Sequence, residues 1–166
     1  MDINWSYKNK SRVFDTKENG GVPYLSFKAL DDTGLAVNGF STRMGGASRG
    51  KFSTMNFSYS RGDAAEDVLE NFTRMAAALG VERDRMVVSH QTHTVNLRRV
   101  TLEDAGKGVI RERDYRDIDG LITDVPGATW CTFYADCVPL YLLDPVNRAI
   151  GLSHPDGGER LNAWVR

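Results

Sequence analysis

The sequence has 166 residues, and its 21 basic and 22 acidic side chains leave a formal net charge of −1. This near balance gives no electrostatic reason to expect nucleic acid or an anionic membrane surface as a partner. No apolar run approaches the roughly 20 residues that a membrane-spanning helix needs, and residues 1–5 lack the start of a secretion signal. The length and a hydrophobic content of 41% favour one globular domain, which we expect in the cytoplasm.

Residues 1–38 contain turn signals and partly alternating apolar residues, a pattern typical of edge strands and turns. A short predicted strand then leads into Arg43, Gly45 and Gly46. Glycines tolerate positive φ and let backbone N–H groups line a concavity that suits an anion such as phosphate. Arg43 could add a bidentate contact to that anion. An ordinary loop with a solvated arginine explains the same residues.

Residues 56–60 read as another short strand, and the clearest helix of the sequence follows. Asp63 lies at the expected N-cap and Glu66 three residues later, the pattern of a capping box. Gly80 occupies the position just past the expected C-terminus. Apolar residues recur at helical spacing between these ends, and we interpret them as core. They are Val68, Leu69, Phe72, Met75, Ala76 and Leu79.

Two histidines follow a predicted short strand at residues 86–88. On a continuing strand His90 and His93 would point to opposite faces, so at most one of them would face a site. Gln91 would then share the face of His93. A lone histidine is more often a structural or surface residue than a ligand. Residues 101–117, which come next, read as a charged loop.

The segment Ala-Asp-Cys-Val-Pro at residues 135–139 separates two apolar runs, 128–134 and 140–143. Each run reads as a buried strand, and the proline should interrupt the ladder because it has no N–H to donate. Asp136 and Cys137 would then lie at a strand end, where a rigid scaffold can hold polar side chains over a cleft.

Cys131 and Cys137 are the two cysteines of the chain. On one straight strand they would share a face yet lie too far apart to bridge, so we expect both to be reduced. His93, Cys137 and His154 each lie at or just past a predicted strand end. Three nitrogen or sulfur ligands with an open fourth position are the arrangement of a catalytic zinc site. Their spacing matches no CxxC or HExxH pattern, so structural roles stay open beside this one.

Short motifs occur in a specific order: Ser-Thr-Arg-Met-Gly-Gly at 41–46, Gly62-Asp63 with Val68 and Asn71, Gln-Thr-His at 91–93, Asp-Gly-Leu-Ile-Thr at 119–123 and Ala-Asp-Cys-Val-Pro at 135–139. This succession resembles the laccase-domain family, first named multicopper polyphenol oxidases and later reassigned as purine nucleoside phosphorylases. The resemblance runs from about Gly39 to His154. It implies a layered α/β fold of mixed α+β type, in which helices flank a mixed β-sheet.

The resemblance also implies a metal and a chemistry. The metal would be zinc, with copper as the alternative, bound by His93, Cys137 and His154. The activity would be phosphorolysis of adenosine, inosine, guanosine and methylthioadenosine, a transferase reaction with purine nucleosides and phosphate as partners. Adenosine deamination, a hydrolase reaction, would be a second activity.

Within this interpretation we predict catalytic roles for Arg43, Cys137 and Asp136, the last by orienting a metal ligand. The expected substrate-binding residues are Gly45, Gly46, Asn56 and Gln91. A copper oxidase acting on phenols is the second hypothesis, because two histidines and one cysteine also make a trigonal copper site. The chain has only three histidines, too few for a multicopper centre. An inactive metal-binding fragment is the third hypothesis.

The family pattern continues past its last histidine as His-x-Gly-Trp-Arg-Gly, whereas Pro155 and a short dissimilar tail follow His154 here. Loss of one base directly after the His154 codon would convert that family motif into these residues, given suitable codons. We therefore expect residues 1–154 to be the N-terminal portion of one family domain, incomplete at its C-terminus. Residues 155–166 would be an atypical, out-of-frame ending.

Overall fold

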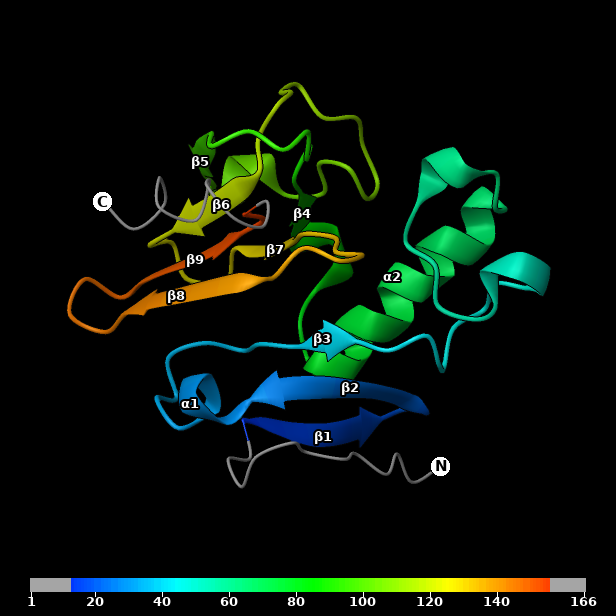
Figure 1. Cartoon of the computed structure of the whole chain (residues 1–166), viewed down its shortest axis with the longest axis horizontal. Helices are drawn as coiled ribbons and strands as arrows, with labels where there is room; N and C mark the ends of the chain where they lie inside the picture. The colour runs from blue at the N-terminus through cyan, green and yellow to red at the C-terminus, as the bar shows by residue number, and fades with distance from the viewer. Residues whose placement is uncertain (1–12, 156–166) are drawn as a thin grey trace. The chain divides into compact units, whose positions relative to one another are not determined.

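The structure, a computed structural model, describes residues 13–155 (Figure 1). The chain divides into two compact units, Met1–Val81 and Glu82–Arg166, and each is described by itself. The fold is of the expected mixed α+β type, with several small sheets and few helices. Among residues 13–155, no helix combines the length and the apolar character that a membrane span requires. The tail that we expected at residues 155–166 lies outside the described residues apart from Pro155.

The first unit pairs a small antiparallel sheet with one long helix (Figure 1). The sheet has the strand order β1-β2-β3. Gly20 and Gly21 join the first two strands with φ of 58° and 78°, as a two-residue hairpin turn requires. The elements are β1 (Phe14–Asn19), β2 (Val22–Phe27), α1 (Lys28–Asp31), β3 (Phe40–Ser41), the 3₁₀ turns Gly50–Phe52 and Tyr59–Arg61, and α2 (Ala65–Leu79).

Helix α2 supplies the core of the first unit. Most of its apolar stripe is buried as expected, with Val68 and Phe72 at most 1% exposed, whereas Leu69 and Leu79 are half-buried. Gly80 ends the helix in the left-handed region, with φ of 71°, which confirms the expected C-terminus. Side chains from the helix and the sheet meet in one cluster, so the hairpin and the helix stabilise each other. The cluster consists of Val22, Tyr24, Met55, Met75 and Ala78.

Two local expectations for this unit were wrong. The N-cap residue is Ala64 and makes no side-chain cap, because the Asp63 carboxylate accepts hydrogen bonds from Ser48 Oγ (2.6 Å) and Asn56 Nδ2 (2.9 Å) instead. Residues 56–60 form no strand. The Asn56 side chain accepts the N–H of Ser58 at 3.2 Å, a turn that bends the chain away from an extended path.

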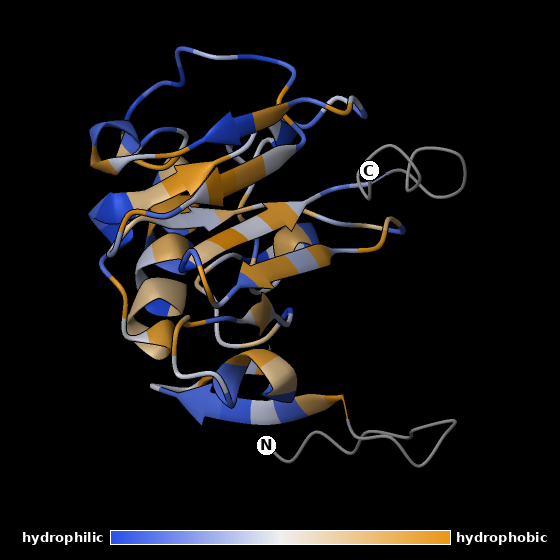
Figure 2. Cartoon of the chain, turned by 90° about the vertical axis from the view of Figure 1, so that its left-hand side faces the viewer, coloured by the Kyte–Doolittle hydropathy of each residue, from blue (hydrophilic) through white to orange (hydrophobic). Residues whose placement is uncertain are grey.

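The second unit contains a parallel strand pair, β4-β7, and a mixed sheet of order β5-β6-β9-β8. Strand β5 is parallel to β6, whereas β9 is antiparallel to both β6 and β8. Apolar residues predominate along β6, β8 and β9 of the mixed sheet (Figure 2), and Val87, Val100, Tyr115 and Leu121 form a buried core cluster in this unit. The elements are β4 (Met86–Val88), β5 (Leu97–Arg99), β6 (Gly120–Thr123), β7 (Thr129–Cys131), β8 (Leu140–Asp144), β9 (Ala149–Ser153) and the 3₁₀ turns Arg83–Arg85 and Leu102–Asp104.

A buried ionic cluster lies in the loop region after β5. Asp104 accepts hydrogen bonds from Lys107 Nζ (2.7 Å) and Arg98 Nη2 (2.8 Å), and the side chains of Asp104 and Lys107 are 6% and 9% exposed. Burial alone would raise the pKa of Asp104. The hydrogen bonds from Lys107, Arg98 and the backbone of Thr101 outweigh burial and lower this pKa to about 2.

The strand expected over residues 128–134 is shorter than the apolar run suggested. Strand β7 ends at Cys131, and β8 begins only at Leu140. The Gln91 side chain takes up both backbone groups of Phe133, accepting from its N–H (2.7 Å) and donating to its carbonyl (2.6 Å). These groups therefore cannot join a ladder. Asp136 and Cys137 lie in the resulting loop, and the expected break before β8 is confirmed.

Candidate metal centre

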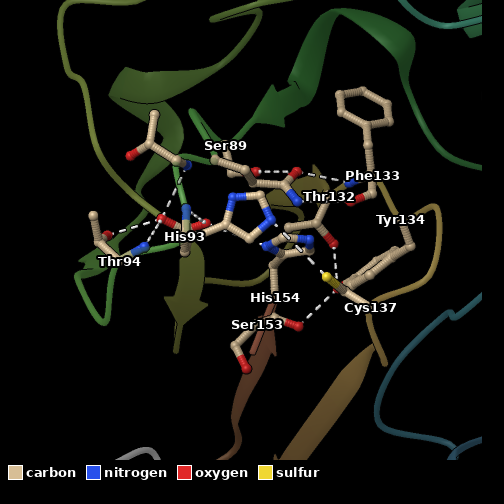
Figure 3. A network of polar contacts seen from close by, with 12 residues as sticks. Ser89, His93, Thr94, Thr132, Phe133, Tyr134, Cys137, Ser153 and His154 are labelled. Atoms are coloured by element: carbon tan, nitrogen blue, oxygen red, sulfur yellow. Dashed lines mark hydrogen bonds and ion pairs between the residues drawn. The ribbon is translucent and has the colours of Figure 1, made fainter. Parts of the chain in front are cut away.

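The structure brings together the three side chains that the sequence singled out as metal ligands. The side chains of His93, Cys137 and His154 point toward one another (Figure 3). Their donor atoms all lie within 4.8 Å of one another. Cys137 Sγ is 4.0 Å from His93 Nε2, and the two imidazole rings meet edge to face with centroids 4.9 Å apart. All three side chains belong to the second unit.

This donor set fits a small borderline-soft cation. Tetrahedral zinc with two nitrogens and one sulfur needs donors about 3.4–3.6 Å apart, which follows from Zn–N of about 2.0–2.1 Å and Zn–S of about 2.3 Å. The donor atoms lie farther apart than this, with 4.0 Å between Cys137 Sγ and His93 Nε2 and all three within 4.8 Å, so the side chains would have to rotate toward the cation to bind it. Three ligands leave a fourth position for water or substrate, which suits catalysis better than a purely structural site.

His93 follows β4 in a loop rather than on a strand. Its φ of 63° lies in the left-handed region, so the alternation expected for a strand does not apply at this position. The backbone N–H of His93 donates to Asp119 Oδ1 at 2.9 Å, which holds this turn. His90 has a structural role instead, because its Nδ1 accepts the backbone N–H of Asp117 at 3.1 Å.

His154 directly follows β9 and is 5% exposed. Its backbone N–H donates to the carbonyl of Asp119 at 2.8 Å, and its Nδ1 lies 3.3 Å from Asp119 Oδ1. The Tyr134 ring packs beside it with centroids 5.4 Å apart, and the Tyr134 hydroxyl donates to the Ser153 carbonyl at 2.8 Å (Figure 3). The ring of His154 is therefore held from two sides.

Cys137 is half-buried in the loop between β7 and β8. Gln91 anchors the start of this loop through Phe133, and Ser89 Oγ donates to the same Gln91 carbonyl at 3.0 Å. The Gln91 amide therefore serves the loop that carries Cys137. Its predicted contact with substrate stays a prediction.

The two cysteines occupy different environments and form no disulfide. Cys131 lies in β7 with its Sγ 3.8 Å from the Val87 carbonyl, and burial raises the pKa of this thiol to about 12. A thiol that resists ionisation is a poor metal ligand, because metals bind the thiolate. Cys137, in contrast, has its Sγ 4.0 Å from His93 Nε2, inside the candidate donor set.

Asp136, which we expected to orient a ligand, has an exposed side chain. That contact is made by Asp119 instead, which is fully buried and approaches both histidines. Asp119 is not among the site residues that were predicted from the sequence. The signal was present, since Asp119 opens the Asp-Gly-Leu-Ile-Thr motif, but a short motif does not reveal which neighbours its carboxylate meets. A catalytic role of Asp136 stays a prediction.

The backbone N–H groups of the glycine loop in the first unit already donate to acceptors within the protein. The N–H groups of Gly46, Ala47 and Ser48 donate to Thr54 Oγ1, Asn71 Oδ1 and the Thr54 carbonyl, respectively. A Cβ at Gly46 would lie 2.0 Å from the Thr54 carbonyl oxygen, so this glycine permits close backbone packing. An anion cradled by these N–H groups would have to displace those bonds. Substrate binding by Gly45 and Gly46 stays a prediction.

Arg43 and Asn56 also belong to the first unit. The exposed Arg43 guanidinium donates through Nε (3.2 Å) and Nη2 (2.8 Å) to the Ser53 carbonyl, which fixes its direction. Asn56 donates to Asp63, and its own carbonyl accepts Asn71 Nδ2 at 2.7 Å. Asn56 therefore takes part in a polar network behind the loop, and the substrate roles of both residues stay predictions.

Comparison with known proteins places the chain. A family model described as multi-copper polyphenol oxidoreductase laccase matches residues 37–158. Purine nucleoside phosphorylase YlmD of Geobacillus stearothermophilus is 36% identical over 123 residues, which cover 72% of this chain and 44% of that protein. The Bacillus subtilis protein of the same name is 32% identical over 122 residues, which cover 71% of this chain and 43% of that protein. The chain spans about half the length of the curated relatives it matches.

Solved structures agree with the sequence comparison. The crystal structure of YlmD from Geobacillus stearothermophilus matches with a TM-score of 0.76 and 33% identity, over 92% of this chain and 54% of that one. A hypothetical protein YfiH of Bacillus licheniformis matches with a TM-score of 0.76 and 27% identity, over 87% and 52% of the two chains. The His93–Cys137–His154 cluster thus lies inside the matched region, and the chain belongs to the multi-copper polyphenol oxidoreductase laccase family.

Proposed function

We propose that this chain carries the metal centre of a zinc-dependent purine nucleoside phosphorylase that also deaminates adenosine. The observation that supports the proposal is the convergence of His93, Cys137 and His154 in a chain whose relatives bear the phosphorylase name. The substrates would be adenosine, inosine, guanosine and methylthioadenosine, each with phosphate. We place the protein in the cytoplasm, where these metabolites and reduced thiols occur together, with neither nucleic acid nor a membrane as partner.

The proposed reaction exchanges one bond for another. A phosphate oxygen bonds to C1′ of the ribose while the bond from C1′ to the base nitrogen breaks, and the base leaves with a proton. Zinc, when bound, supplies a Lewis acid that polarises a water or substrate oxygen. His93 and His154 would hold it through ring nitrogens and Cys137 through its thiolate, so both rings must be neutral.

The other predicted residues would bind and orient the substrate. Arg43 would hold phosphate or stabilise the charge that develops on the departing group, because a guanidinium matches an oxyanion with paired donors. Gln91 and Asn56 would contact the base or the ribose, and Gly45 and Gly46 would lie against the phosphate. Asp136 would assist from the exposed side of the cysteine loop.

The cysteine pair offers a matched test. Cys137→Ala should abolish stoichiometric zinc binding and phosphate-dependent release of base from inosine or adenosine. Cys131→Ala should retain zinc, because the Cys131 thiol is held away from the cluster against the Val87 carbonyl. Metal content and base release would be measured on the purified 166-residue chain. Zinc and full turnover in the Cys137→Ala protein would refute the assignment.

The same measurement separates the two alternatives. Zinc without turnover would favour the inactive metal-binding fragment and would locate essential groups in the half of the relatives that this chain does not match. The copper oxidase keeps some support from the description of the family and from the trigonal donor set. Its signature would be intense visible absorption on copper loading together with oxidation of a phenol.

A further inference from the structure

A carboxylate without a role in the proposed reaction lies directly behind the metal centre. Asp119 is 0% exposed, and an unpaired buried carboxylate is costly enough that such groups are almost always compensated. Its pKa nevertheless lies below the ordinary value. Burial acts to raise it, but hydrogen bonds from the Thr94 backbone and side chain and from the Thr92 and His93 backbones outweigh burial.

The donors around Asp119 come from the loop that carries the first ligand. Three consecutive N–H groups point at the carboxylate, from Thr92 (3.2 Å), His93 (2.9 Å) and Thr94 (2.8 Å). The Thr94 hydroxyl adds a fourth contact at 2.8 Å. Consecutive N–H groups converge in this way only when the chain curls, and His93 supplies the curl with a φ of 63°. The carboxylate therefore stabilises the backbone conformation that presents the His93 ring.

The same carboxylate meets the second ligand. His154 donates its backbone N–H to the Asp119 carbonyl at 2.8 Å, and its Nδ1 approaches Asp119 Oδ1 to 3.3 Å. A carboxylate is purely an acceptor, so this contact selects the tautomer in which Nδ1 of His154 carries the proton. Nε2 then keeps its lone pair for a metal. Asp119 thus orients this ring and selects its tautomer.

We propose that Asp119 is the positioning residue of the metal centre, joining His93 and His154 into one preformed unit through a single buried carboxylate. This inference rests on the proposed metal centre. Carboxylates that hydrogen-bond a ligating histidine fix its tautomer and raise its basicity, and their loss typically lowers metal affinity about 10–100-fold. Here one group acts on two ligands, so its loss should affect the whole donor set.

A neighbouring carboxylate provides the matched control. Asp117 is 59% exposed and also contacts the ligand loop, accepting the Thr92 hydroxyl at 2.9 Å. Its Oδ1 lies 3.9 Å from His90, outside the donor set, and its φ of 55° is one that asparagine tolerates well. Asp119→Asn and Asp117→Asn therefore make the same chemical change two positions apart.

The first experiment measures zinc affinity by competition with a chromophoric chelator, for the wild-type chain and both variants. We expect Asp119→Asn to lower the affinity about 10–100-fold, and Asp117→Asn to leave it within about twofold. Equal affinity in Asp119→Asn and wild type, or equal losses in the two variants, would overturn the positioning role. Absence of zinc binding by the wild-type chain would instead refute the proposed metal centre, so the two failures are distinguishable.

The second experiment uses only the wild-type chain, so its result does not depend on whether a variant folds. Nitrogen-15 NMR of the metal-free wild-type chain at pH 8 reports which ring nitrogen of His154 carries the proton. We expect the Nδ1–H tautomer to dominate, although the Nε2–H tautomer is the usual one for an unconstrained histidine. A dominant Nε2–H form of His154 would contradict the inference whatever the affinity measurements show.

Discussion

Two buried carboxylates of the second unit, Asp104 and Asp119, solve the same physical problem in opposite ways. Asp104 is neutralised by cations, since Lys107 and Arg98 both donate to it. Asp119 accepts from backbone N–H groups and a hydroxyl and faces an imidazole. In the first arrangement the cationic side chains balance the negative charge of Asp104. The second keeps a net negative charge behind two candidate metal ligands, which would favour a cation placed between them.

The comparison predicts different costs for the two sites. Asp104→Asn should lower the free energy of unfolding by about 3–5 kcal/mol, because it leaves the buried Lys107 ammonium without its main partner. Zinc affinity should not change. Urea denaturation checks the first statement and chelator competition the second.

Asp114→Asn is the control for that prediction. Asp114 also pairs with Lys107, at 2.8 Å, but its side chain is 67% exposed. Exposed pairs contribute about 0–1 kcal/mol, so this variant should remain close to wild type. If both variants lowered the free energy of unfolding only slightly, the charge-balanced cluster around Asp104 would not be the stabilising element that we infer.

Acid should reveal the Asp104 cluster as well. The pKa of Asp104 is lowered to about 2 in the folded state, so its stabilising contribution is present above the unfolded pKa of about 4. That contribution is lost as pH falls through about 2, and it amounts to about 2 kcal/mol. The difference in unfolding free energy between wild type and Asp104→Asn should therefore narrow by about 2 kcal/mol between pH 4 and pH 2. Parallel curves over that range would contradict the assignment.

The smallest expected effect on zinc affinity concerns Gln91. Its side chain holds the loop that carries Cys137 only through neutral hydrogen bonds to the Phe133 backbone. Gln91→Met keeps the side-chain volume but removes both contacts with the Phe133 backbone. The loss of these hydrogen bonds should cost about 1 kcal/mol of the free energy that holds the Cys137 loop in place. This cost corresponds to about fivefold weaker zinc binding. Unchanged zinc affinity with a raised KM for nucleoside would assign Gln91 to the substrate instead.

The elements that were predictable from sequence are those with local determinants. Apolar residues at helical spacing and Gly80 predict helix α2, and a short apolar run predicts β9. The capping of α2 was mispredicted because Asp63 has partners in a distant loop, Ser48 and Asn56. The apparent strand over residues 128–134 was overestimated for the same kind of reason, since Gln91 removes Phe133 from any ladder.

The candidate metal ligands show how much of the site residue types and motifs can predict. Positions at or just past predicted strand ends, together with the family motifs, singled out His93, Cys137 and His154, and the structure brings them together. Asp136, next to Cys137 in sequence, was predicted to orient a ligand, whereas the carboxylate that the structure places against the two histidines is Asp119. The role of Asp136 stays a prediction. Sequence proximity is a poor guide to such contacts, because a loop residue beside a ligand commonly points to solvent.

The sequence by itself therefore determined the family, the mixed α+β class and the identity of the candidate ligands, because these depend on residue types and on order along the chain. Only the tertiary structure decided which carboxylate contacts the two candidate histidine ligands and which thiol lies against the Val87 carbonyl. Those outcomes depend on burial and on hydrogen bonds between segments far apart in sequence, such as His93 with Asp119 and Cys131 with Val87. Local patterns carry no information about these contacts until the chain has folded.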